Sequence, residues 1–185
     1  MFRKWLIAEY PKPYNSFGNG SAMRVSPCAW VAKSLDEALF LAEKSAIVTH
    51  NHPEGVKGAQ AVAAAIWMAR NGSTKEEIKA YIESTFEYNL SRTIKEIKES
   101  GYDFDSTCQG SVPESIIAFL EGNDYEEVIR LAIYLGGDAD TQAAIAGSIA
   151  EAFYDMPVRF IGDVEKRLDK YLLSVLNKFN EFCNE

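Results

Sequence analysis

Two aspartates and a threonine follow a pair of glycines in residues 136–141, which read Gly-Gly-Asp-Ala-Asp-Thr. Aspartates two positions apart point to different faces of a regular helix. At a helix start, behind two glycines that allow unusual backbone angles, the carboxylates can converge instead. Asp138, Asp140 and Thr141 would then offer hard oxygen ligands for Mg²⁺, Ca²⁺ or Mn²⁺. Spacing alone favours the alternative, in which the acids stabilise the first turn of a helix.

A second candidate site is the run Gly-Asn-Gly-Ser-Ala-Met-Arg at residues 18–24. Glycines on both sides of Asn19 allow a tight turn with positive φ. Backbone N–H groups in such a turn, followed by a helix N-terminus, suit a phosphate or a ribose hydroxyl. Arg24 could pair with a phosphate or with a buried carboxylate. Taken alone, the run is more typical of a structural turn before a helix.

Two histidines, His50 and His52, lie two positions apart before Pro53. They could ligate a metal or bind an anion. No cysteine and no third ligand lie nearby in the sequence, so a zinc site is weakly supported. Such histidines more commonly cap a helix end or lie in solvent.

A fourth segment, Cys-Gln-Gly-Ser at residues 108–111, precedes a predicted helix. A cysteine nucleophile needs a partner base, and the sequence places none beside Cys108. The glycine and Ser111 could cradle an oxyanion or a phosphate, and the alternative is a capped helix start.

Helix signals dominate the elements that must position these residues, and no alternating strand pattern is present. Ser34, Thr74 and Asp124 each precede a glutamate by three positions, which is the pattern of a capping box. The alanine-rich stretch at 53–70 predicts a central, buried helix. Helices are predicted over about residues 2–10, 35–49, 53–70, 75–86, 91–100, 113–121, 125–135, 138–154 and 164–182. The sequence therefore predicts an all-α, single-domain, multi-helix bundle over residues 1–185.

Composition excludes several classes of protein. The formal net charge of −8 argues against a nucleic-acid surface, which needs clustered Lys and Arg. The 3 cysteines are widely spaced, which argues against a disulfide framework or a zinc site and favours reduced thiols in the cytoplasm. The most apolar stretch, residues 61–69, is too short to span a bilayer.

The order of the four segments is more specific than any one of them. Gly-Asn-Gly-Ser-Ala-Met-Arg, then Thr-His-Asn-His-Pro, then a Gly/Ser-rich helix start, then Gly-Gly-Asp-Ala-Asp-Thr-Gln-Ala-Ala-Ile-Ala-Gly resembles the ADP-ribosylglycohydrolase family. That family includes the dinitrogenase reductase-activating glycohydrolases, and the resemblance covers roughly residues 14–157. Its members are all-α, bind two Mg²⁺ or Mn²⁺ ions and cleave the N- or O-glycosidic bond to ADP-ribose. We therefore expect a metal-assisted hydrolase that acts on ADP-ribose or an ADP-ribosylated substrate.

The resemblance also implies roles for single residues. It implies that the metal ligands are Asp138, Asp140 and Thr141. It implies that the ADP-ribose site is formed by Gly18, Asn19, Gly20, Ser21, Met23, Arg24, His50, Ser111 and Gly137.

The sequence departs from the family pattern at its start. Family members begin with a Gly-Asp-x-x-Gly helix and a Thr-Asp-Asp segment, which supplies the other metal ligands and often the assisting acid. This chain contains no Asp-Asp pair, and Ser16 stands where some relatives carry an acid. Three protein oxygens hold a hydrated Mg²⁺ weakly and do not make a two-metal cluster. We therefore expect an N-terminally truncated member, with no residue assigned as catalytic. Its alternatives are a non-catalytic ADP-ribose or nucleotide-binding module, one subunit of a split enzyme, and a truncated product with a structural role.

A bundle without its first helices exposes the apolar faces that they cover, and large apolar patches seldom persist on soluble monomers. The sequence therefore predicts a homodimer or higher oligomer, with residues 2–10 as a candidate contact. A partner chain that supplies the missing helices is the alternative.

Overall fold

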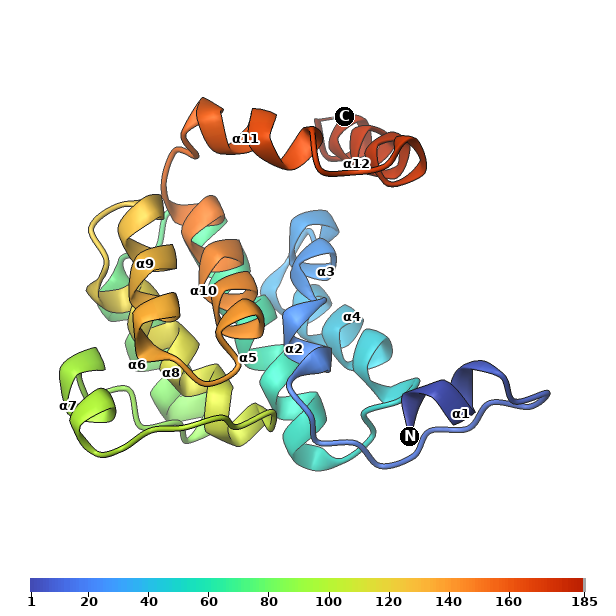
Figure 1. Cartoon of the computed structure of the whole chain (residues 1–185), viewed down its shortest axis with the longest axis horizontal. Helices are drawn as coiled ribbons and strands as arrows, with labels where there is room; N and C mark the ends of the chain where they lie inside the picture. The colour runs from blue at the N-terminus through green and yellow to red at the C-terminus, as the bar shows by residue number, and fades with distance from the viewer. Residues whose placement is uncertain (185) are drawn as a thin grey trace.

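The computed structural model describes residues 1–184, which form helices joined by short loops (Figure 1). No β-strand occurs in this part, where a single antiparallel bridge joins Gly18 and Thr107. The prediction of an all-α fold is therefore confirmed. The helices are α1 (Phe2–Leu6), α2 (Gly20–Met23), α3 (Ser26–Val31), α4 (Leu35–Ile47), α5 (Pro53–Arg70), α6 (Lys75–Phe86), α7 (Ile94–Glu99), α8 (Cys108–Glu121), α9 (Tyr125–Leu135), α10 (Ala139–Phe153), α11 (Val158–Glu165) and α12 (Lys170–Asn184).

Helix α5 is the centre of the bundle and contacts α2, α3, α4, α6, α8 and α10. Its buried side chains are mostly alanine, with glycines in its first two turns. Small side chains let the neighbouring helices approach closely. A Cβ atom placed on Gly58 would lie only 2.5 Å from the Cys108 sulfur at the start of α8. The predicted central, buried helix is therefore confirmed.

The helix starts follow the predicted caps. The Ser34 hydroxyl accepts from the Glu37 N–H at 3.1 Å, and the Asp124 carboxylate accepts from the Glu127 N–H at 2.8 Å. Thr74 and Glu77 form the complete reciprocal box. These hydrogen bonds satisfy N–H groups that a helix leaves unpaired at its first turn.

The predicted single helix over residues 164–182 is wrong. The chain forms α11 and α12 instead, and the Asp169 side chain accepts from the Leu172 N–H at 2.8 Å to cap the second helix. Apolar residues at Val164, Leu168 and Leu172 keep helical spacing across the break, so hydrophobic periodicity alone did not reveal it.

Other predicted boundaries also shift. Helix α1 ends at Leu6 rather than residue 10, and none of its residues is buried. Helix α8 begins at Cys108, where the Thr107 hydroxyl accepts from the Gly110 N–H at 3.1 Å. Pro113 therefore lies inside that helix rather than in its first turn.

The two C-terminal helices lie along one end of the bundle (Figure 1), where the ring centres of Phe160 in α11 and Tyr125 in α9 are 5.8 Å apart and α12 borders a pocket with α3. Several of their apolar side chains are exposed, among them Tyr171 (74%) and Phe182 (62%). Among residues 1–184, no helix is both long and apolar enough to cross a lipid bilayer.

Candidate functional site

The N-terminal ends of four helices form the candidate site. Asn19 precedes α2, His52 precedes α5, Thr107 precedes α8, and Asp138 precedes α10. Helix α2 contacts α5, α8 and α10, and α8 also contacts α5 and α10. Side chains of His52 and Thr107 cap the starts of α5 and α8, whereas the starts of α2 and α10 have no side-chain cap.

Asn19 joins three of these helix starts. Its side-chain Nδ2 donates to Ser111 Oγ at 3.1 Å and to Asp138 Oδ2 at 2.8 Å. The partners lie 92 and 119 positions away in the sequence. Asn19 is only 6% exposed; its hydrogen bond to Ser111 is buried, and the one to Asp138 is partly buried. The resemblance placed these three residues at one site, and the structure brings them into contact.

Backbone pairing holds the Asn19 loop in place. The Asn19 N–H donates to the Ser106 carbonyl at 2.8 Å, and the Cys108 N–H donates to the Phe17 carbonyl at 2.9 Å. The loop before α2 is thereby fixed to the loop before α8.

The glycine pair before α10 has the predicted unusual backbone. Gly136 has φ of 84° and Gly137 has φ of 71°, both in the left-handed region. A side chain at residue 137 would also be crowded, because its Cβ would lie 2.9 Å from Tyr102 Cε1. Asp138 follows as the N-cap residue, but its side chain does not cap the helix. It is directed to Asn19 instead.

The three predicted metal ligands are neighbours in space. A hydrogen bond with the Asp138 side chain, followed by one from the Thr141 N–H, lowers the pKa of the Asp140 carboxyl. The Thr141 hydroxyl donates to the Met23 sulfur at 3.5 Å. Asp138, Asp140, Thr141 and Met23 therefore border one region.

These side chains fit a single hydrated divalent cation. Asp138 and Asp140 supply carboxylates and Thr141 supplies a hydroxyl, which are donors that Mg²⁺ and Mn²⁺ accept. In the described part of the chain, no group of three or more His, Cys, Asp or Glu side chains is arranged to hold a metal. The residues present therefore suit one ion that keeps most of its water ligands.

The prediction of a tight turn with positive φ at Gly18 and Gly20 is wrong. Among residues 1–184, positive φ occurs at other glycines and not at these two. Both lie against the His50 ring, and Cβ atoms placed on them would be 3.6 and 3.5 Å from His50 Nε2. These are ordinary contact distances, so neither an unusual turn nor a close approach requires glycine at these two positions.

His50 is held as a neutral ring. Arg24 donates to Thr49 Oγ1 at 3.1 Å, and Thr49 Oγ1 lies 2.7 Å from His50 Nδ1. Thr49 Oγ1 therefore pairs with both Arg24 and the His50 ring. Burial, followed by the charge of Arg24, lowers the pKa of His50 to about 4. The neutral ring turns its Nε2 edge toward Gly18 and Gly20.

Other predicted residues have supporting positions. The Ser21 hydroxyl donates to the Gly55 carbonyl at 2.7 Å inside the bundle, so it joins α2 to α5. His52 accepts from the Glu54 N–H at 3.1 Å and caps α5, which is the alternative that the sequence favoured. Burial raises the pKa of the Cys108 thiol to about 11, so Cys108 is a packed interior group rather than a nucleophile.

The sequence analysis missed three residues beside the site. Tyr102 Oη accepts from Gln142 Nε2 at 2.7 Å and donates to the Gly110 carbonyl at 2.8 Å. The Phe17 ring is 43% exposed and lies 5.2 Å from the His52 ring, measured between centroids. Phe17 and Gln142 lie beside or within the motifs of the sequence, but only the tertiary contacts give the three residues a place at the site.

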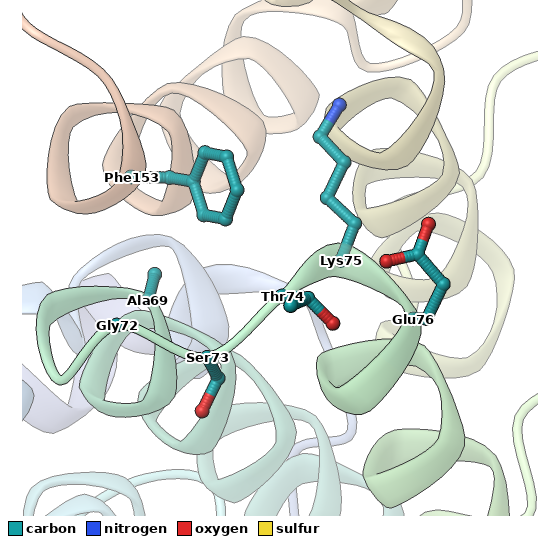
Figure 2. Close-up of a pocket in the computed structure, with 7 residues that line it drawn as sticks. All are labelled: Ala69, Gly72, Ser73, Thr74, Lys75, Glu76 and Phe153. Carbon is teal, nitrogen blue, oxygen red and sulfur yellow. The ribbon is translucent and has the colours of Figure 1, made fainter.

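A separate pocket of about 390 Å³ lies between the end of α5, the start of α6 and Phe153 (Figure 2). Lys75 extends from its wall and donates to the Leu120 carbonyl at 3.0 Å and to the Gly122 carbonyl. The same ammonium lies 5.2 Å from the Phe119 ring centre and 5.4 Å from that of Tyr154. Lys75 therefore links α6 to the end of α8, away from Asn19 and Asp138.

Comparisons with known proteins give a consistent result. ADP-ribosylarginine hydrolase Tri1 of Pseudomonas putida is 33% identical over 148 residues, which are 74% of this chain and 38% of that protein. Human ADP-ribosylhydrolase ARH3 is 28% identical over 185 aligned positions, which cover 76% of this chain and 51% of that protein. A solved structure described as an ADP-ribosylglycohydrolase-related protein complex matches with a TM-score of 0.63 and 28% identity, over 82% of this chain and 56% of that chain.

The chain thus spans about half or less of the length of these two relatives. The family model for ADP-ribosylglycohydrolase matches residues 1–181, which is nearly all of the sequence. This protein belongs to the ADP-ribosylglycohydrolase family.

Proposed function

We propose that this chain binds ADP-ribose at the Asn19–Asp138 site and takes part in hydrolysis of the N- or O-glycosidic bond that joins ADP-ribose to its carrier. The main observation in support of this proposal is the pair of hydrogen bonds from Asn19 to Ser111 and Asp138. They hold the starts of α2, α8 and α10 together beside an acidic pair. Membership of the family supports the substrate class.

The chemistry of the site suits the parts of ADP-ribose. Converging helix starts favour its pyrophosphate, because their N–H groups and partial positive charge attract anions. The exposed face of Phe17 offers a flat surface for stacking of the adenine base. The N–H of Gly20 and the Nε2 edge of His50 offer polar groups to phosphate or ribose oxygens.

A divalent cation is part of the proposal. Asp138, Asp140 and Thr141 would hold Mg²⁺ or Mn²⁺, with one ion rather than two on this chain alone. The ion would supply charge that polarises ribose hydroxyls and activates water. The remaining residues bind and orient the substrate, with Asn19 fixing the Asp138 carboxylate and Met23 contacting Thr141.

A second candidate is a non-catalytic ADP-ribose-binding module or one subunit of a split enzyme. The observation that favours it is the small number of oxygen ligands in the described part of the site. A complete enzyme would then need further carboxylates from another polypeptide or from a preceding segment.

Exposed apolar side chains support the proposed homodimer or other assembly. They occur on α1 and on the outer face of α12, as with Leu6, Ile7, Tyr171 and Phe182. Burial of such side chains in an interface is favourable by about 25 cal/mol per Å². A strictly monomeric species in light scattering at micromolar concentration would contradict this part of the proposal.

A cytoplasmic location is proposed because the free cysteines Cys28, Cys108 and Cys183 suit a reducing compartment.

Calorimetric titration of ADP-ribose, with and without Mg²⁺, tests the proposed function. We expect binding that strengthens with Mg²⁺ and is lost in the Asp138→Asn/Asp140→Asn variant. The Asp155→Asn variant is the matched control, because Asp155 is an exposed acid outside the site. Absence of binding to the unmodified chain under both conditions would contradict the proposal.

Turnover assays separate the two candidates. Release of ADP-ribose from an ADP-ribosylated peptide by the chain alone would support the hydrolase. Binding without turnover, followed by turnover when a relative's N-terminal segment is added, would support the split enzyme.

A further inference from the structure

The turn before Asp138 does not by itself fix the orientation of the Asp138 carboxylate. Its backbone follows two glycines in the left-handed region, and its side chain does not cap α10. Glycine gives a turn more conformational freedom than any other residue. Without a neighbouring contact, the residue after such a turn would sample several orientations.

Tyr102 packs directly against this turn. A Cβ atom placed on Gly137 would lie 2.9 Å from Tyr102 Cε1 and 3.1 Å from the Asp103 carbonyl oxygen. On the other side of the turn, Lys98 Nζ donates to the Leu135 carbonyl at 3.0 Å. The segment from α7 to Asp103 therefore lies against both glycines.

The Tyr102 hydroxyl also connects the first turns of α8 and α10. It donates to the Gly110 carbonyl at 2.8 Å and accepts from Gln142 Nε2 at 2.7 Å. Gly110 precedes Ser111, and Gln142 lies one helical turn after Asp138, to whose carbonyl its N–H donates at 2.9 Å. Tyr102 thus links the two helices that carry the acceptors of the Asn19 amide.

Two observations indicate that both hydrogen bonds of the Tyr102 hydroxyl persist. Gln142 is 0% exposed, so its amide has no access to bulk water as an alternative partner. Burial, followed by the negative charges of Glu114, Asp105 and Asp138, raises the pKa of Tyr102. The phenol is therefore protonated at neutral pH, where it donates to the Gly110 carbonyl.

From this arrangement, and resting on the proposed function, we propose that Tyr102, together with Gln142, is a positioning residue for the ligand site. It fixes the separation of Ser111 and Asp138 so that the single Asn19 amide nitrogen reaches both. Tyr102 itself need not touch ADP-ribose or the cation. Its contribution to binding passes through the orientation of Asp138.

The test compares Tyr102→Phe with Tyr154→Phe. Each substitution removes one hydroxyl that donates to a backbone carbonyl at 2.8 Å, but Tyr154 donates to Gly122, away from the site. The first readout is the ¹⁵N–¹H NMR signal of the Asn19 side-chain amide in the chain without ligand. We expect Tyr102→Phe to shift this signal and speed its hydrogen exchange, and Tyr154→Phe to leave it unchanged.

The second readout is calorimetric binding of Mg²⁺ and of ADP-ribose with Mg²⁺. Loss of an orienting partner of a ligating side chain typically weakens binding by about tenfold or more, so we expect that loss for Tyr102→Phe only. Gln142→Met, which removes the amide from the other end of the link, should reproduce both effects. An unchanged Asn19 signal in Tyr102→Phe and Gln142→Met would overturn the inference. A shifted signal in a chain that binds no ADP-ribose would uphold the positioning role and contradict the proposed function instead.

Discussion

Replacement of Asn19 by aspartate exchanges a hydrogen-bond donor for a third carboxylate among Asp138 and Asp140. The new oxygen would lie where Asn19 Nδ2 now lies, 2.8 Å from Asp138 Oδ2. The side chain keeps its size, so packing changes little. Asn19→Leu is the matched control, because it removes the amide without adding a charge.

The expected loss of folding stability follows from two free-energy terms. Loss of a hydrogen bond to a charged acceptor costs about 1.5–3 kcal/mol, and both variants lose it. Two carboxylates about 3 Å apart repel by roughly 5 kcal/mol at an effective dielectric constant near 20, less whatever a shared proton relieves. We therefore expect a loss of about 2 kcal/mol for Asn19→Leu, and for Asn19→Asp at neutral pH a loss of up to roughly 6.5–8 kcal/mol, which is the sum of the two terms before any relief by a shared proton. For a chain of this size, each kcal/mol lowers Tm by about 2–4 °C.

Thermal unfolding followed by circular dichroism, at pH 7 and pH 5, measures both terms. The difference in Tm between Asn19→Asp and Asn19→Leu should be smaller at pH 5 than at pH 7, because a proton shared between the introduced carboxylate and Asp138 neutralises one member of that pair.

Mg²⁺ should raise the Tm of Asn19→Asp more than that of the unmodified chain, because a third carboxylate strengthens the cation site and a bound ion stabilises the folded state. Equal losses in both variants, with no response to pH or Mg²⁺, would refute the proximity of Asn19 to an ionised acid. An unchanged Tm in both variants would refute the hydrogen bonds from Asn19 to Ser111 and Asp138.

Three further predictions concern packing and protonation. Gly58→Ala should destabilise the chain by about 1–3 kcal/mol in urea unfolding, since its methyl group would meet the Cys108 sulfur at 2.5 Å, whereas Gly162→Ala meets nothing within 4 Å and should stabilise α11 by up to about 1 kcal/mol. His50 should titrate near pH 4 in NMR, so it contributes stability above pH 6.5 that is progressively lost as pH falls toward 4, and a pKa near 6.5 would contradict its burial. Lys75→Met should cost about 1.5–3 kcal/mol, because two helix-end carbonyls lose a charged donor, and an unchanged midpoint would show that water replaces it.

The sequence by itself determined the local features of this protein. The caps at Ser34, Thr74 and Asp124 and the alanine-rich α5 could be predicted because a cap involves residues three apart and helical periodicity repeats within a few turns. At the glycine pair before Asp138 the sequence predicts only a flexible break, and the positive φ of both residues comes from the structure. The order of the motifs led to the family, which the comparison over residues 1–181 confirms.

Tertiary structure alone decided how those residues meet. Asn19 contacts Ser111 and Asp138 across 92 and 119 positions, and the Tyr102 link to Gln142 crosses 40. No spacing rule predicts such contacts, because they depend on how whole helices pack around α5. The break between α11 and α12 could not be predicted for a related reason. The spacing of apolar residues indicates which face of a helix is buried. The side-chain cap at Asp169 begins a new helix without changing that spacing.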